Sequence, residues 1–171
     1  MKDRNSVRVL CVTALLMAIN IVLSSFGVPV PGGRMYLNDV IVCTAGILLT
    51  PFWAFMVGGV GAFIGDFLFY PAPMFVSLVV HGVQAVVISL FSRGEGKRRV
   101  VMSCIGTAIG AVIMVVGYTL GRAYIYSTPE YAVMKLPFQI LQAVFGGVVA
   151  LILCWNLGLV KTYERFLEKE R

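Results

Sequence analysis

The run from Val7 to Phe26 (VRVLCVTALLMAINIVLSSF) constrains this chain most, because it is apolar and carries no charge after Arg8. At a rise of about 1.5 Å per residue, about 20 such residues cross the roughly 30 Å hydrocarbon core of a bilayer. A secretory signal peptide also begins with basic residues and an apolar stretch, but this run is longer and no Ala-x-Ala cleavage site follows it. We therefore predict a first membrane-spanning helix that stays in the mature protein.

The composition extends this prediction to the whole chain. Of the 171 residues, 59% are hydrophobic and 13% are charged, and the mean hydropathy is +0.90, whereas soluble domains have about 45–50% apolar and about 25% charged residues. The apolar runs are long and uninterrupted, which is typical of helices rather than of barrel strands. The sequence predicts an all-α integral membrane protein with a single domain over residues 1–171, embedded in a lipid bilayer.

Proline, glycine and polar clusters divide the chain into six apolar segments. Gly27 to Arg34 is a turn-rich loop, Pro51 separates two helices, Pro71-Ala-Pro73 breaks the chain again, and two polar loops follow. The predicted helices cover about residues 7–26, 35–50, 51–70, 74–91, 100–124 and 132–160, and an amphipathic charged tail covers 161–171.

The basic residues predict the orientation of this bundle. Arg34, Arg122 and Lys135 fall on one predicted side, which leaves eleven of the 14 basic residues in the N-terminal segment, the loop over 93–99 and the tail. Because cytoplasmic loops are enriched in Lys and Arg, we predict that both the N and the C termini are cytoplasmic. Glycines that recur at four-residue spacing in the third and fifth predicted helices favour a compact six-transmembrane-helix bundle.

Several function classes find no support in the sequence. The four cysteines lie singly in apolar runs without CxxC spacing, which predicts neither a metal site nor disulfides. The basic residues cluster at segment ends, so they indicate topology rather than nucleic-acid binding. With one histidine, no Gly-x-Ser-x-Gly elbow and no His-Glu-x-x-His helix, the chain is predicted to be no enzyme and to need no cofactor.

Polar side chains at membrane depth are costly, so they are candidates for function. Three pairs share a helix face on consecutive predicted helices: His81 with Gln84, Tyr118 with Arg122, and Gln139 with Gln142. A single such pair is more typical of an interhelical hydrogen bond. Three pairs together indicate a cavity, open to the outside, that binds a small polar heteroaromatic ligand.

The second predicted helix begins with the segment Tyr36-Leu-Asn-Asp39. Asn38 or Asp39 either caps this helix or faces the cavity, and both interpretations stay open. We include Tyr36, Asn38 and Asp39 among the candidate binding residues. Asp66, near the outer end of the third predicted helix, is expected to pair with a cation on the same side, Arg122 or Lys135.

Ala14 and Ala18 place two small residues on one face of the first predicted helix, within Ala14-Leu-Leu-Met-Ala18. This pattern is similar to the Ala-x-x-x-Ala signature of the S components, the substrate-binding membrane subunits of energy-coupling factor (ECF) vitamin transporters. The whole chain resembles that family in size and topology, in its loop Pro29-Val-Pro-Gly-Gly33 followed by Tyr36, and in its glycine-rich third helix.

The resemblance implies a subunit of an ECF-type ABC importer that captures a water-soluble vitamin outside a bacterial plasma membrane and delivers it inward. It would dock through its first three helices, with Ala14 and Ala18 in the contact, on a transmembrane T subunit driven by two ATP-binding cassette ATPases. Helices four to six would form the pocket. The loop after the first helix would act as a gate, formed by Val28, Pro29, Pro31, Gly32, Gly33 and Arg34.

Among the substrates of the family, the sequence is similar to members for small pyrimidine or pyridine vitamins, such as hydroxymethylpyrimidine or pyridoxine. The neutral hydrogen-bonding groups and His81 suit an uncharged heterocycle, whereas Arg122 suits a carboxylate such as pantothenate; riboflavin and folate stay open. Two alternatives are a membrane enzyme that uses Asp66 or His81 and a scaffold subunit that binds no ligand.

Overall fold

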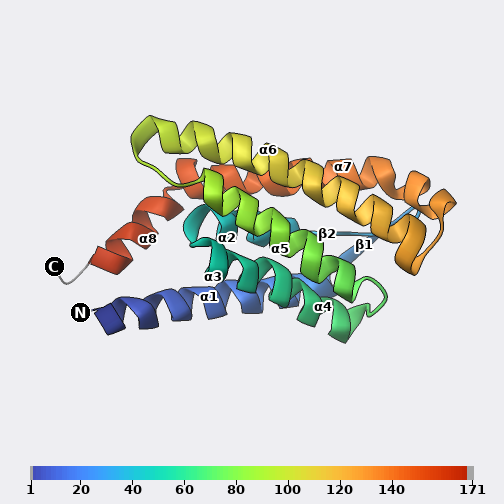
Figure 1. Ribbon diagram of the computed structural model, residues 1–171, viewed down its shortest axis with the longest axis horizontal. Coiled ribbons are helices and arrows are strands. Elements are labelled where there is room, and N and C mark those ends of the chain that lie inside the picture. The colour runs from blue at the N-terminus through green and yellow to red at the C-terminus, as the bar shows by residue number, and fades with distance from the viewer. Residues whose placement is uncertain (1, 169–171) are drawn as a thin grey trace.

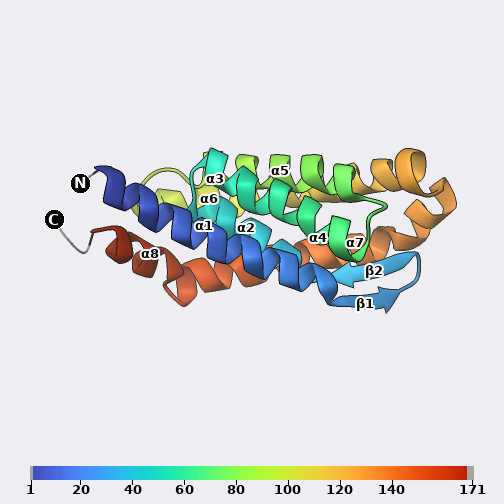
Figure 2. The ribbon, with the colours of Figure 1, turned by 90° about the horizontal axis from the view of Figure 1, so that it is seen from below.

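The computed structural model describes residues 2–168, with side chains described from residue 7 onward, so the last three residues of the predicted tail lie outside it. The chain forms an elongated bundle of roughly lengthwise helices (Figure 1). Helix α1 (Lys2–Ser25) begins at the end of the bundle where α8 (Leu159–Glu168) ends. A β-hairpin lies at the opposite end, as Figure 2 shows from a second direction.

Five segments are long and apolar enough to cross a membrane, which makes this a multi-pass membrane protein. They correspond to the first, third, fourth, fifth and sixth predicted helices. In three of them an α-helix passes directly into a π-helical turn (η). The segments are α1; α3 (Pro51–Phe55) with η1 (Met56–Val60) and α4 (Gly61–Phe69); α5 (Met74–Phe91); α6 (Gly96–Gly121) with η2 (Arg122–Tyr126); and α7 (Pro129–Leu151) with η3 (Ile152–Asn156).

The helix observed at the place of the second predicted helix is much shorter than the spanning segments. Helix α2 (Asn38–Leu48) has 11 residues, which at about 1.5 Å each span roughly 16 Å, or half of a bilayer core. It begins three residues later than predicted because the preceding residues form a strand. It ends where Leu49 becomes extended, just before Pro51.

The stretch predicted as an irregular loop is an antiparallel hairpin of β1 (Gly27–Val30) and β2 (Gly33–Tyr36). The prediction of an entirely helical chain is wrong here. Pairing of the two strands satisfies backbone groups that a bare loop leaves open. Pro31 and Gly32 make the turn, and the φ of +80° at Gly32 fits the third position of a type II turn, where glycine is favoured.

Helix α5 packs against α2, α6 and the α3–α4 segment. A Cβ atom built on Gly59 would lie 2.8 Å from the Leu78 carbonyl oxygen and 3.1 Å from the Gly82 Cα, so the two backbones nearly touch. The buried side chains include Val42, Ile47 and Ile88 on α2 and α5. This close packing agrees with the compact bundle predicted from the glycines.

The prediction of one last helix over 132–160 is wrong at its C-terminal end. The observed segment ends at Asn156, and Gly158, with a φ of +72°, turns the chain into the separate amphipathic helix α8. The Arg8 guanidinium donates to the Phe166 carbonyl oxygen at 3.0 Å and ties α8 to α1. The fifth predicted helix, over 100–124, begins four residues earlier than predicted, at Gly96.

Candidate ligand-binding site

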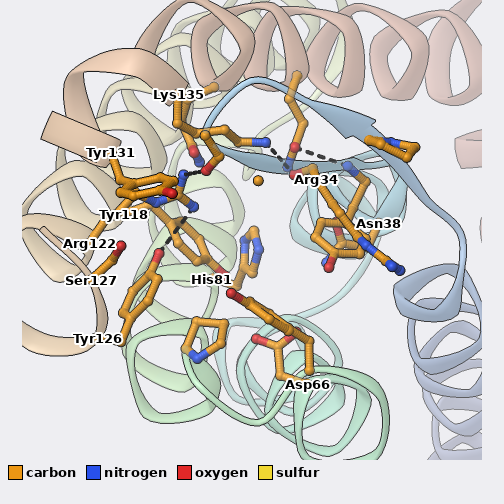
Figure 3. A pocket seen from close by; sticks show the side chains of 18 residues that line it. Arg34, Asn38, Asp66, His81, Tyr118, Arg122, Tyr126, Ser127, Tyr131 and Lys135 are labelled. Carbon is orange, nitrogen blue, oxygen red and sulfur yellow. Dashed lines mark hydrogen bonds between the residues drawn. The ribbon is translucent and has the colours of Figure 1, made fainter.

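A cavity of about 490 Å³ lies under the hairpin, between it and helices α4 to α7 (Figure 3). Its wall is rich in tyrosine and holds cations, one carboxylate and neutral amides. The lining residues are Pro29, Gly32, Gly33, Arg34, Tyr36, Asn38, Asp66, Tyr70, Pro73, His81, Tyr118, Arg122, Tyr126, Ser127, Tyr131, Lys135, Gln139 and Gln142.

Most of the candidate binding residues line this cavity. These are Tyr36, Asn38, His81, Tyr118, Arg122, Gln139 and Gln142. The spacing of three or four residues placed each pair on one helix face. Of the pair on α5, however, only His81 reaches the cavity. Gln84 and Asp39 lie buried behind the wall, where they hold the lining residues in place.

Asp39 joins α2, α5 and α7 through hydrogen bonds, and it is fully buried. Gln84 Nε2 donates to Asp39 Oδ1 at 3.3 Å, and Gln142 Nε2 donates to Asp39 Oδ2 at 2.6 Å. A Cβ atom on Gly146 would lie 2.5 Å from the Asp39 Cβ, so α7 approaches α2 closely at this point. Neither Asn38 nor Asp39 caps α2, since Leu37 occupies the cap position without a side-chain bond.

Asp66 does not bond to Arg122 or Lys135 as expected. It accepts a short hydrogen bond from Ser77 Oγ, which in turn accepts from the Tyr118 hydroxyl at 2.5 Å. Ser77 lies one turn before His81 on α5 and faces α4, so it is the nearer partner. Asp66 is therefore joined through Ser77 to Tyr118 on the cavity wall.

Side chains of η2 and α7 hold the hairpin over the cavity. Arg122 Nη1 donates to the Gly32 carbonyl oxygen at 2.9 Å, and Lys135 Nζ donates to the Arg34 carbonyl oxygen. The Tyr36 N–H donates to Gln142 Oε1 at 3.0 Å. Figure 3 shows Lys135 and Arg122 reaching toward the hairpin from the same side of the cavity.

The hairpin residues divide between the cavity and the outer surface. Of the predicted gate, Pro29, Gly32, Gly33 and Arg34 line the cavity, whereas Val28 and Pro31 do not. Burial, together with the nearby Asp66 carboxylate, raises the pKa of the Tyr36 phenol above its ordinary value. Tyr36 therefore stays a neutral group at neutral pH.

Several lining residues were not among the candidates: Asp66, Tyr70, Pro73, Tyr126, Ser127, Tyr131 and Lys135. Tyr126 follows Arg122 by four residues, and Arg122 Nη2 donates to its hydroxyl at 3.2 Å, so the same spacing rule identifies it. Tyr131 and Lys135 precede Gln139 by eight and four residues, so the same rule identifies them too. Asp66 was singled out as a charged group but not as a binding residue, and no spacing marks Tyr70, Pro73 or Ser127. In the described part of the chain, no three His, Cys, Asp or Glu side chains gather in a way that suits a metal ion.

Ala14 and Ala18 lie away from this cavity. Both are exposed on the outer face of α1, where no other element within residues 2–168 covers them. Between them lies Leu15, also exposed. The structure thus leaves the small-residue face free for contact with lipid or with another protein.

Comparisons with known proteins agree with this architecture. The model of the family described as the S component of ECF-type riboflavin transporters matches residues 4–159. An uncharacterized protein of Pyrococcus woesei is 30% identical over 134 residues, which cover 77% of this chain and 88% of that protein. A solved structure of the S component of a bacterial ECF transporter superposes with a TM-score of 0.70 at 17% identity, covering 92% of this chain and 96% of that one. With the family match spanning nearly all of its length, this chain belongs to the ECF-type riboflavin transporter S-component family.

Proposed function

We propose that this chain is the substrate-binding subunit of an ECF-type importer and that it captures riboflavin. The main support for this proposal is the cavity of about 490 Å³ at one end of the membrane bundle, which tyrosine side chains line. Cavities of roughly 300–1,000 Å³ suit ligands of that size class, and tyrosine rings stack on flat heteroaromatic systems. The description of the matching family supports the choice of riboflavin.

The one-ring vitamins hydroxymethylpyrimidine and pyridoxine are the second candidates. The amides of Asn38, Gln139 and Gln142, with His81, suit their uncharged polar groups. Either molecule would fill only part of the cavity and leave the rest to water, so the volume favours the larger vitamin. A carboxylate such as that of pantothenate has Arg122 and Lys135 as partners, but both already bond to hairpin carbonyl oxygens.

In this proposal the hairpin is the gate, and the end of the bundle that carries it faces outward from a bacterial plasma membrane. The face around Ala14 and Ala18 docks on a T subunit, and two ATPases drive that subunit. S components work with such partners, and the exposure of both alanines supports the assignment of the face. The bundle itself binds and releases the vitamin and catalyses no reaction.

The test is ligand identification on the purified protein in detergent. We expect mass spectrometry to find riboflavin bound, and titration to show tighter binding of riboflavin than of pyridoxine, hydroxymethylpyrimidine or pantothenate. Tyr118→Ala, on the wall, should weaken binding at least tenfold, since it removes ring contacts and the Ser77 bond. Val112→Ala, exposed on the outside of α6, is the matched control.

Other outcomes would favour the alternatives. A protein that binds a one-ring vitamin and not riboflavin would move the assignment to the second candidates. A protein that binds no vitamin and does not purify with a T subunit would favour the scaffold. Turnover of a bound molecule that is lost in Asp66→Asn or His81→Ala would indicate a membrane enzyme.

A further inference from the structure

Asp39 controls the direction of a buried hydrogen-bond chain. Both carboxylate oxygens of Asp39 accept hydrogen bonds from amide nitrogens, so Gln84 turns its Nε2 donor toward Asp39. The other end of that amide, Oε1, then faces His81 Nδ1 at 2.8 Å. The orientation of the Gln84 amide therefore follows from the chemistry of its partner.

The same logic fixes the proton on His81. Gln84 Oε1 only accepts, so His81 Nδ1 must carry the proton that makes the bond. In a neutral ring with a proton on Nδ1, Nε2 has a free lone pair and is an acceptor. The Nδ1 edge is turned to Gln84, which does not line the cavity, so the Nε2 edge is left to face the cavity that His81 lines.

We propose that Asp39, acting through Gln84, sets His81 as a hydrogen-bond acceptor toward the cavity, so that the site selects ligands that present an N–H or O–H donor there. Asp39 is a positioning residue in this scheme, and His81 is the residue that touches the ligand. The proposal rests on the proposed function, in which the donor is the imide N–H of the riboflavin ring system.

A second observation supports an acceptor-rich cavity floor. The Oδ1 atom of Asn38 is buried without a hydrogen-bond partner among the described residues, and Asn38 lines the same cavity. A buried acceptor left unpaired is unfavourable, and a ligand donor that reached it would remove that cost. Asn38 and His81 thus both favour a bound molecule that has hydrogen-bond donors.

The carboxylate also reaches the hairpin. Asp39 Oδ2 accepts from Gln142 Nε2, which leaves Gln142 Oε1 to accept from the Tyr36 N–H on β2. One carboxylate therefore orients two amides, one toward the histidine and one toward the hairpin backbone. Replacement of Asp39 should affect the state of His81 and the seating of the hairpin together.

The chain contains a single histidine, which makes the test direct. The full-length protein is labelled with ¹⁵N-histidine, and the two ring nitrogens are observed by NMR without ligand at neutral pH. We expect one neutral tautomer, with Nδ1 protonated and Nε2 unprotonated. A protonated Nε2, whether in the other tautomer or in a charged ring, would overturn the proposal.

Two variants test whether Asp39 sets the His81 tautomer or only supports the fold. In Asp39→Asn, the new amide can donate as well as accept, so Gln84 is free to reverse and the single-tautomer signature should be lost. Asp66→Asn removes the carboxylate of the cavity wall, which bonds to Ser77 and not to Gln84, and should keep that signature. If Asp39→Asn folds and keeps the wild-type signature, Asp39 does not set the tautomer.

The ligand-binding measurements use the wild-type protein, so they do not depend on how a variant folds. Riboflavin should shift the Nε2 resonance, and riboflavin methylated on the imide nitrogen should bind roughly tenfold weaker or worse, because the acceptor is left unpaired. Equal binding of the two would contradict the donor requirement. If riboflavin does not bind at all, the proposed ligand fails, and the labelled histidine still decides the role of Asp39.

Discussion

Arg122 and Lys135 are the residues that connect the hairpin to the helices by charge-assisted bonds. Each donates to a carbonyl oxygen of the hairpin, at Gly32 and Arg34 respectively. A Cβ atom on Gly32 would lie 2.8 Å from the Lys135 backbone nitrogen, so the turn rests directly on α7. These contacts are few and are made by side chains, which suits a segment that closes and opens.

If the hairpin is the proposed gate, we expect Lys135→Met to speed ligand dissociation about tenfold, because the variant loses a hydrogen bond to a charged group, worth about 1.5–3 kcal/mol, from the closed state. Stopped-flow displacement of bound riboflavin measures this rate. Lys161→Met, the same substitution on exposed α8, is the control and should leave the rate unchanged. An unchanged rate in Lys135→Met would show that this bond does not hold the hairpin closed.

At this scale, sequence reasoning identified residues better than it identified their partners. His81, Tyr118 and Gln139 were found because helical spacing alone puts pairs on one face. The partner of Asp66 was predicted wrongly, since charge alone suggested a cation and the packing of α4 on α5 supplies Ser77. Which of two residues reaches a cavity depends on helix rotation, which one sequence does not determine.

The contact of η1 with α5 is the tightest backbone approach described here between spanning segments. It depends on Gly58 and Gly59 on one side and Gly82 on the other. Lipid provides no hydrophobic drive for helices to associate, so such close packing contributes much of the stability of a membrane bundle.

Gly59→Val should lower the thermal midpoint of the purified protein, with a cost of about 1–3 kcal/mol for overpacking, because its side chain would meet the α5 backbone. Ala14→Val adds side-chain carbons at an exposed position and should leave the midpoint within experimental error. Thermal unfolding followed by circular dichroism compares the two. Equal midpoints would mean that the bundle relaxes at this contact without cost.

Elements were predictable where local signals decide them. The helix over Met74–Phe91 was predicted with its observed bounds, since Pro73 and a polar loop delimit it. The hairpin was missed because its strands are four residues each and rich in glycine and proline, and only their pairing makes them strands. The break at Gly158 was missed because the apolar run continues past it.

Within residues 2–168, the basic residues lie mainly at the end where α1 begins and α8 ends. The loop before α6 lies at this same end in Figure 1, as the predicted topology requires. The hairpin end has Arg34, Arg122 and Lys135, all next to the cavity. The asymmetry predicts which end faces the cytoplasm.

We expect a cysteine introduced at Glu130 to react with a membrane-impermeant thiol reagent in intact cells, and one at Glu95 to react only after permeabilisation. Both positions are exposed, at opposite ends of the bundle. The four native cysteines are first replaced by alanine. The reverse labelling pattern would refute the predicted orientation.

The exposed face of α1 gives a second prediction for the whole molecule. The double variant Ala14→Trp, Ala18→Trp should abolish uptake while leaving ligand binding unchanged, because bulky side chains prevent close approach of a partner helix. Val112→Trp, on the exposed face of α6, is the matched control. Normal uptake by the double variant would rule out this face as the docking surface.

The short α2 helix has a consequence for passive flux. Its N-terminus forms the floor of the cavity at Asn38, about 16 Å above its other end. The space beneath is filled by Val42, Ile47 and Ile88, each 2% exposed or less. In the proposed function, a vitamin that enters under the hairpin would stop above this layer of packed side chains. We therefore expect that the isolated subunit does not let its ligand leak across the membrane. Release on the far side would need another protein that changes the side toward which the cavity opens.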